Sequence, residues 1–411
     1  MRSLFKHALS LSVMLVATAV HAQKLPVYHI YSGSTHAHTS YTESHGSQMT
    51  QIAGAKKYQE VDSMGVQRAI NTTINPDWRK VQGPPSEHFA LAKAKGYDFY
   101  IVTDHSQEAG FAPPSPGNPQ WISTHEQAMK ATDKNFVAIV GYEHSENDGP
   151  GPKGHLNVIN SRSYLNALFP GIDIKSLYKW VDTVSSYGPG PVVATFNHPA
   201  ADAWDKWAYR DEKVTDVFTM LEVINSNANI HYEAFVNALD AGWKVSPVCG
   251  NDNHGTAGIS QQTSRTFVLA TEKTQKAILE AMAARRTYAS LEQNIQCRYT
   301  VNGAMMGATL KGGDTFKFDI SISDPDTNKP QDWITKIEIM KDNGTVADTY
   351  VPSSPSHAVV WKPTVKNASA KYFFIRVWNA GGGDVVNGKA PADPQKPVAW
   401  LAPVWIDRGT Y

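Results

Sequence analysis

Histidines and carboxylates stand at the ends of short apolar runs in the first two thirds of this chain. Four of them form two pairs with one residue between, His36-x-His38 and Asp252-x-His254. In an extended segment, side chains two positions apart point to the same face, so each pair presents two side chains together. Single residues of the same types lie at four further runs: His105, Glu143, His155 and His198. Imidazole and carboxylate groups together suit zinc, manganese or iron.

This arrangement predicts a polynuclear metal site at one rim of a barrel. A single His-x-His is a weak signal, but two such pairs with single ligands between them are hard to obtain by chance. Against Glu143 and Asp252, two divalent ions would leave a charge of about +2 and three ions about +4. A site of that charge favours an anionic substrate and a metal-bound hydroxide, so phosphate esters fit it. The nucleophile motif Gly-x-Ser-x-Gly does not occur.

The elements that would position these residues alternate from Tyr28 to about Ala270. Near-continuous apolar runs are typical of parallel strands covered on both faces. Helix-like stretches separate them: Ser86–Lys95, His125–Lys134, Ile174–Ser185 and Ile230–Ala241. Seven or eight such units predict a TIM-like α/β barrel, regular or irregular.

Three long connections follow strand ends, at the rim that carries the ligands: Tyr41–Pro85, Ser106–Ser123 and Ala200–Asp216. The proline-rich segment from Pro113 to Pro119 excludes a regular helix or strand. Trp204 and Trp207 either contact the substrate or pack over the barrel mouth. Three basic residues would contact phosphate or are solvated surface charges: Lys153, Arg162 and Arg210.

Beyond a boundary near Asn294–Cys297 the pattern changes to period two, which is typical of antiparallel strands. Four segments show it: Phe316–Ile322, Ile334–Lys341, His357–Trp361 and Tyr372–Trp378. We therefore expect a barrel over residues 23–295 and a small antiparallel β-sandwich over residues 296–411. The second unit shows no ligand cluster. Cys249 and Cys297 either form a disulfide or remain buried thiols.

The first residues predict a signal peptide over residues 1–22. Arg2 and Lys6 give a basic start, Ala8–Val20 is apolar, and Val20-His21-Ala22 is a small-residue cleavage signal. We expect a periplasmic or secreted product; the alternative is an uncleaved anchor. No later run is long enough to span a membrane. With 38 basic and 38 acidic residues and no basic tract, nucleic-acid binding by charge is not indicated.

The order of these motifs resembles the PHP (polymerase and histidinol phosphatase) superfamily. The residues are His36-x-His38, Thr103-Asp104-His105, Glu143, His155, Asn197-His198-Pro199, Asp252-x-His254 and the ending Arg286–Ser290. Val301-Asn302-Gly303 and Ala399–Ile406 resemble a secreted branch with a C-terminal β domain. The resemblance implies a distorted (β/α)7 barrel and a trinuclear metal site.

The resemblance also implies nine metal ligands. His36, His38, Glu143 and Asp252 would hold one ion. Glu143 would bridge to a second ion held with His155 and His198. A third ion would take His105, His254 and a loop histidine matched by His45. Asp104, Asn197, Asn251 and Asn253 would orient imidazoles, or are ordinary turn residues. His144 follows Glu143 directly and should point away from the ligands.

The sequence thus predicts an exported hydrolase with two or three divalent ions of zinc, manganese or iron. The first hypothesis is a phosphoesterase that uses a metal-bound hydroxide, with Glu143, Asp252 and His254 in catalysis. Its substrate would be a small anion such as a phosphate ester. One alternative is an amidohydrolase-type enzyme acting on C–N or C–O bonds. The other is a non-catalytic carbohydrate-binding protein with a relic barrel.

Overall fold

The computed structural model describes most of the chain after residue 25. The described residues are 26–42, 82–106, 108, 111, 117–146, 154–166, 172–226, 229–383 and 393–409, with the backbone of four two-residue strands, β2 to β5, between positions 49 and 74. The predicted signal peptide, His45 and Lys153 lie outside these residues. None of the described helices is long and apolar enough to cross a membrane.

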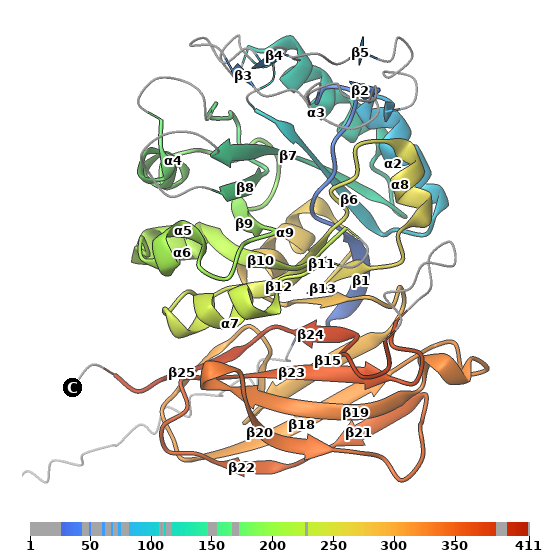
Figure 1. Ribbon diagram of the computed structural model, residues 1–411, viewed down its shortest axis with the longest axis vertical. Coiled ribbons are helices and arrows are strands. Elements are labelled where there is room, and N and C mark those ends of the chain that lie inside the picture. The colour runs from blue at the N-terminus through green and yellow to red at the C-terminus, as the bar shows by residue number, and fades with distance from the viewer. Residues whose placement is uncertain are drawn as a thin grey trace, which may run out of the picture.

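Seven strands form a barrel: β1 (His29–Ser34), β6 (Phe99–His105), β7 (Val137–Glu146), β8 (Gly154–Ile159), β9 (Val193–Asn197), β10 (Phe218–Asn225) and β12 (Ser246–Gly250) (Figure 1). They are hydrogen-bonded in the order β1-β6-β7-β8-β9-β10-β12. The chain after β12 returns to the chain after β1, where the Asp252 N–H donates to the His36 carbonyl at 2.9 Å. A parallel bridge between His38 and His254 continues this contact. The barrel thereby closes beside both predicted ligand pairs.

The apolar runs predicted parallel strands throughout the barrel, and this prediction was wrong for one strand. β8 runs antiparallel to both β7 and β9, while β6–β7 and β9–β10 are parallel. Only a short segment joins β7 to β8, and antiparallel neighbours need no helical crossover. The reversal explains why His155 lies near the start of its strand, whereas the other ligands lie in the last half of their strands or just after them. The start of β8 lies at the same rim as the ends of its neighbours.

Six described helices lie between barrel strands: α2 (Pro85–Ala94), α3 (Pro119–Ala131), α4 (Ile174–Val181), α5 (Ala203–Trp207), α6 (Glu212–Val217) and α7 (Tyr232–Asp240). Two more follow the last barrel strand: α8 (Thr256–Gln261) and α9 (Gln275–Ala283). Among the four predicted helices, the largest difference is the start of α3, at Pro119 rather than His125. The predicted connection Ala200–Asp216 also contains α5 and most of α6. Proline is favourable in the first helical turn. The Asn118 side chain also accepts a hydrogen bond from the Trp121 N–H, which caps the helix.

The C-terminal strands form two packed sheets, below the barrel in Figure 1. Their strand pairs are antiparallel except for Thr309–Lys311 with Val404–Asp407, which is parallel. One sheet contains β15 (Gln296–Val301), β16 (Ala304–Met305), β18 (Thr315–Ser323), β21 (Ala358–Trp361) and β22 (Thr364–Lys366). The other contains β19 (Ile334–Lys341), β20 (Thr345–Tyr350), β23 (Tyr372–Asn379), β24 (Ala399–Leu401), β25 (Val404–Asp407) and β17 (Thr309–Lys311). Residues with period-two burial, such as Phe318 and Ile320, fill the space between the sheets.

The second of these sheets is continuous with the barrel. β13 (Arg265–Ala270) is antiparallel to β1 on one side and to β14 (Thr287–Ser290) on the other. β14 in turn pairs with β24. The fold class is therefore a distorted α/β barrel followed by antiparallel β-sheets. Cys249 and Cys297 are both buried free thiols, as in the second of the two alternatives.

The buried His125 makes stability depend on pH. Its ring is 5% exposed and stacks on Tyr187 with 3.5 Å between centroids. Burial lowers the pKa of His125 to about 3, whereas an unfolded histidine titrates near 6.5. The folded state therefore keeps the ring neutral while the unfolded state takes up a proton as the pH falls below 6.5. The contribution of the neutral His125 ring to the free energy of unfolding is complete above pH 6.5. It is lost progressively as the pH falls from 6.5 towards 3.

We predict that His125→Phe removes this loss. Between pH 6.5 and 5, the free energy of unfolding of the wild type should fall by about 1.5 kcal/mol more than that of the variant. Urea unfolding of chelator-treated protein at both pH values measures the difference. His357→Phe, at an exposed histidine, is the control and should follow the wild type. Equal pH dependence in wild type and His125→Phe would contradict the prediction.

Candidate metal centre

The predicted ligands come together at one rim of the barrel. Strand register places them side by side, with His105 of β6 opposite Glu143 of β7. On the other side of β7, His155 pairs with Ser145, and on β9 it pairs with Asn197, the residue before His198. Asp252 follows the end of β12, next to His36. Residues more than two hundred positions apart in sequence thus share one site.

Three groups of possible metal ligands form this cluster, and the ligand atoms of each group lie within 4.8 Å of one another. The groups are His36, His38 and Glu143; Glu143, His155 and His198; and His38, His105 and His254. Glu143 and His38 each belong to two groups and therefore join the three into one centre. Asp252 lies beside the first group, its Oδ1 3.1 Å from His38 Nε2 and 3.5 Å from His36 Nε2.

This grouping differs in two respects from the one that the family resemblance implied. Asp252 lies beside the first group rather than within it. The third group contains His38 together with His105 and His254. The loop histidine expected there, His45, lies outside the described residues. His144 points away from the centre as predicted, with its Nδ1 3.1 Å from the Leu165 carbonyl oxygen.

The histidines are held in the way that metal-binding histidines usually are. His36 Nδ1 lies 2.8 Å from Glu222 Oε1, and His105 Nδ1 lies 3.3 Å from Glu108 Oε1. The Nε2 atoms of both rings face Glu143, at 3.4 and 2.8 Å. A carboxylate on the far nitrogen fixes the tautomer that leaves the near nitrogen free for a metal. The donor set therefore fits transition-metal ions.

Charge balance supports the same conclusion. Among the described residues, Glu143, Glu222 and Asp252 form ion pairs with histidines alone, without lysine or arginine. Buried carboxylates are costly unless cations compensate them. With Glu108, four carboxylates contact these histidines, so two divalent ions would balance them and three would leave about +2. This is less positive than the sequence estimate, which counted two carboxylates.

The electrostatics favour the ligand forms of Glu143, Asp252 and His38, whereas nearby carboxylates outweigh burial and raise the pKa values of His36, His105 and His198. Burial alone would raise the pKa of Glu143, but His155 and His36 hold it well below its usual range. Asp252 behaves likewise because of His36 and His38. Burial, with His254 and His105 nearby, lowers the pKa of His38 well below its ordinary value. Ionised carboxylates and a neutral imidazole are the forms that bind metals.

Among the described residues, the ligands of the centre differ in their exposure. The side chains of His155, His198 and Asp252 are 21%, 28% and 20% exposed, whereas those of His36 and Glu143 are 0% and 1% exposed. A substrate would therefore approach past these three side chains. His198 and Asp252 also have left-handed backbone conformations, with φ of 29° and 47°. Such strain in non-glycine residues is often concentrated at functional sites.

The residues predicted to orient imidazoles are hydrogen-bonded to other groups. Asp104 accepts hydrogen bonds from the Thr39 N–H at 2.7 Å and from the Thr39 and Thr42 hydroxyls at 2.8 Å, which hold the segment after His38. Burial raises the pKa of Asp104 to about 6. Asn197 donates to Glu143 Oε1 at 2.9 Å.

The other two asparagines bond to tyrosines. Asn251 donates to the Tyr97 hydroxyl at 3.0 Å, and Asn253 accepts from the Tyr100 hydroxyl at 2.8 Å. Within the part of the chain that the structure describes, none of the four residues forms a hydrogen bond to an imidazole, which favours the second of the two alternatives.

The groups that do orient imidazoles, Glu222 and Glu108, were missed from the sequence. Glu222 stands in the otherwise apolar run Met220-Leu221-Glu222-Val223-Ile224 and is 0% exposed. A lone acid inside such a strand was the available signal, because charged residues are rarely buried unless paired. Glu108 lies three positions after His105, in a segment that the sequence indicated only as loop.

The rim tryptophans pack rather than line the opening. Trp204 and Trp207 are each 2% exposed and lie around Phe196, at 4.8 and 5.3 Å between ring centroids. Arg162 and Arg210 are exposed, in agreement with solvated surface charges.

The C-terminal region, for which the sequence predicted no ligand cluster, does bring three carboxylates together. Asp324, Asp326 and Asp332 have oxygen atoms within 4.8 Å of one another. Lys329 Nζ lies 2.5 Å from Asp326 Oδ2, and Asn294 donates to the same oxygen at 3.1 Å. The protein itself therefore compensates part of this charge.

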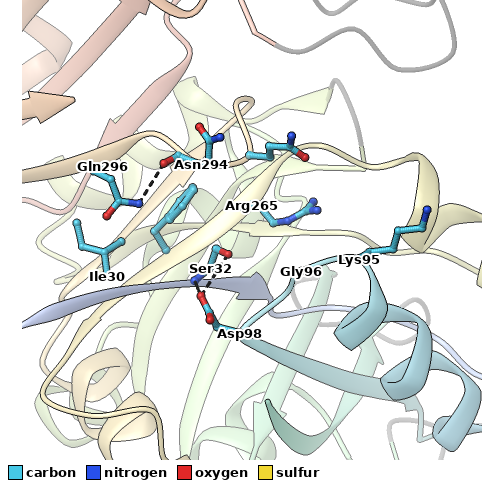
Figure 2. A pocket seen from close by; sticks show the side chains of 10 residues that line it. Ile30, Ser32, Lys95, Gly96, Asp98, Arg265, Asn294 and Gln296 are labelled. Atoms are coloured by element: carbon cyan, nitrogen blue, oxygen red, sulfur yellow. Dashed lines mark hydrogen bonds between the residues drawn. The ribbon is translucent and has the colours of Figure 1, made fainter. Parts of the chain in front are cut away.

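A polar cavity of about 290 Å³ lies between β1, β13 and the segment leading to β15 (Figure 2). Arg265, Asp98 and Ser32 line it, and Asp98 Oδ2 accepts from the Ser32 N–H at 2.8 Å. None of the predicted metal ligands lines this cavity. It is a separate feature from the histidine cluster.

Comparison with known proteins gives structural neighbours only. No protein-family model matches the chain, and no curated protein matches it. A two-domain protein from Bacteroides vulgatus containing a predicted PHP-like metal-dependent phosphoesterase is 16% identical, with a TM-score of 0.44 over 94% of this chain and 100% of that chain. A lesion-specific endonuclease from Pyrococcus furiosus is 13% identical, with a TM-score of 0.33 over 75% of this chain and 62% of that one. At these identities the likeness concerns the course of the chain and not its chemistry.

We predict that the purified protein contains two or three divalent transition-metal ions per chain. Each ion would be bound by one of the three ligand groups. Glu143→Gln should lower that number by at least one, because Glu143 belongs to two of the groups. Elemental analysis measures the content. Glu292→Gln, at a glutamate 1% exposed outside the cluster, is the matched control and should keep the wild-type content. Wild-type protein without bound transition metal, after growth with metals supplied, would rule out the centre.

Proposed function

We propose that this protein is an exported metal-dependent phosphoesterase of the PHP kind, in the secreted branch with a C-terminal β region. The observation that carries the proposal is the convergence of three donor groups, joined by Glu143 and His38, at a rim where His155, His198 and Asp252 are partly exposed. Adjacent metal sites that share a carboxylate suit in-line displacement at phosphorus.

Ions bound there would supply an activated water and would offset the charge on the phosphoryl oxygens. The chain's own residues divide the remaining tasks. Glu143 sets the spacing of two donor groups because it belongs to both. His36 and His38 keep bulk water from the inner side, since both are 0% exposed. Asp252, which is partly exposed, is ionised and lies where a substrate can reach it; we assign it to catalysis with Glu143 and His254.

The completeness of the cluster opposes a relic barrel. A barrel that had lost its chemistry should have lost ligands, yet each expected ligand within the described residues lies at the rim. The remaining alternative, hydrolysis of C–N or C–O bonds, differs in substrate rather than in site. A substrate panel therefore separates the two enzymatic hypotheses.

We predict turnover of phosphate esters by the metal-loaded protein. The panel should hold phosphate monoesters and diesters, sulfate esters, carboxylate esters and amides. The double variant His36→Ala/His38→Ala should lose at least about 100-fold in kcat/KM, more than the loss typical of supporting residues. His357→Ala is the control and should match the wild type. Full activity of the double variant would refute the assignment. Turnover of amides or carboxylate esters alone would favour the amidohydrolase-type hypothesis.

Export is a separate part of the proposal and rests on the first 22 residues. Expressed with its native N-terminus in a Gram-negative host, the protein should appear in the periplasmic fraction. N-terminal sequencing should find Gln23 first, because cleavage follows Ala22. A chain that keeps residues 1–22 and stays in the membrane fraction would indicate the uncleaved anchor.

A further inference from the structure

Glu222 is a buried carboxylate in the barrel wall that is hydrogen-bonded to two histidines of the metal centre and to Asn225. It lies in the middle of β10 and is 0% exposed. Its oxygens lie 2.8 Å from His36 Nδ1, 2.8 Å from the His198 backbone nitrogen and 3.0 Å from Asn225 Nδ2. A carboxylate in an apolar strand is destabilising unless it is fully paired, so its position here calls for a functional reason.

The first consequence of this contact is the orientation of His36. A carboxylate oxygen only accepts, so His36 Nδ1 carries the hydrogen in this pair. Nε2 of the same ring is then free to bind a metal, and it faces Glu143 Oε1 at 3.4 Å and Asp252 Oδ1 at 3.5 Å.

The second consequence concerns two ligands on other strands. His198 has a left-handed φ of 29°, and its N–H donates to Glu222 Oε2. That bond holds the backbone in a conformation that a non-glycine residue rarely adopts. Asn225 donates both to Glu222 Oε2 and, at 3.2 Å, to Asp252 Oδ2. One carboxylate thus connects ligands that follow β1, β9 and β12.

The surrounding backbone leaves space for this contact. A Cβ on Gly250 would lie 2.0 Å from Glu222 Oε1 and 2.8 Å from the His36 Cβ. Any other residue at position 250 would therefore push the two side chains apart. Glycine at the end of β12 is needed for the close approach of β10 and β1 side chains.

We propose that Glu222 is the positioning residue of the metal centre. It orients His36 and His198 directly and Asp252 through Asn225, and it is not itself a ligand. The inference rests on the metal centre of the proposed function, but not on the bond that is hydrolysed.

The test measures metal affinity in the absence of substrate. Zinc and manganese are titrated into the metal-free protein against a competing chelator. Glu222→Gln should bind its tightest ion about 10- to 100-fold more weakly than the wild type, the range found for residues that support metal ligands. Glu222→Asp keeps the charge but is one methylene too short to reach His36, so it should lose affinity similarly. Glu292→Gln, an equally buried change elsewhere, should bind as the wild type does.

A spectroscopic reading separates positioning from general stability. The imidazole Nδ1–H proton of His36, bonded to a carboxylate, should give a downfield NMR signal that disappears in Glu222→Gln and remains in Glu292→Gln. If Glu222→Gln does not fold, Asn225→Ala tests the same network and should weaken metal binding severalfold. The proposal would be overturned if Glu222→Gln or Glu222→Asp bound metal with wild-type affinity. If Glu222→Gln does not fold, wild-type affinity in Asn225→Ala would overturn it instead. A protein that binds metals but cleaves no phosphate ester would overturn the proposed function alone.

Discussion

The structure depends on one buried carboxylate. Glu143 is 1% exposed, and its oxygens lie between 2.8 and 3.5 Å from ring nitrogens of five histidines: His36, His38, His105, His155 and His198. These histidines come from four other strands or strand ends, so the contacts exist only when the barrel is formed. The attraction between carboxylate and imidazoles outweighs the cost of burial and holds the pKa of Glu143 well below its usual range.

Part of this arrangement follows directly from the sequence. The apolar run at His105 is a strand, β6, which ends at that residue, and the two pairs with one residue between both face the metal centre. Apolar runs followed by histidines locate ligands because a strand end fixes both the position and the direction of a side chain. In the C-terminal region, the alternation in Phe316–Ile322 corresponds to the alternating burial of β18, because one face of that strand packs against the opposite sheet.

What the sequence did not reveal are properties of contacts between distant segments. An apolar run has no direction, so the reversal of β8 becomes visible only when its pairing with β7 and β9 is known. Asp104 and Asn197 stand next to ligands in sequence, yet their hydrogen bonds go to Thr39 and to Glu143. Glu222 is remote from every ligand in sequence, yet it lies 2.8 Å from His36 Nδ1. Proximity along the chain was a poor guide to these supporting contacts.

The C-terminal region is connected to this centre through paired strands. β1, which leads into His36 and His38, is held between β6 and β13, and β13 is paired along five of its residues with β1. β13 continues through β14 into β24 of the C-terminal sheet. Phe267 of β13 and Tyr288 of β14 stack with 4.5 Å between ring centroids and belong to the core that the C-terminal strands complete. The sheet beyond the barrel therefore buries the outer face of the strands that support the His-x-His pair, which gives this region a structural role whether or not it also binds a ligand.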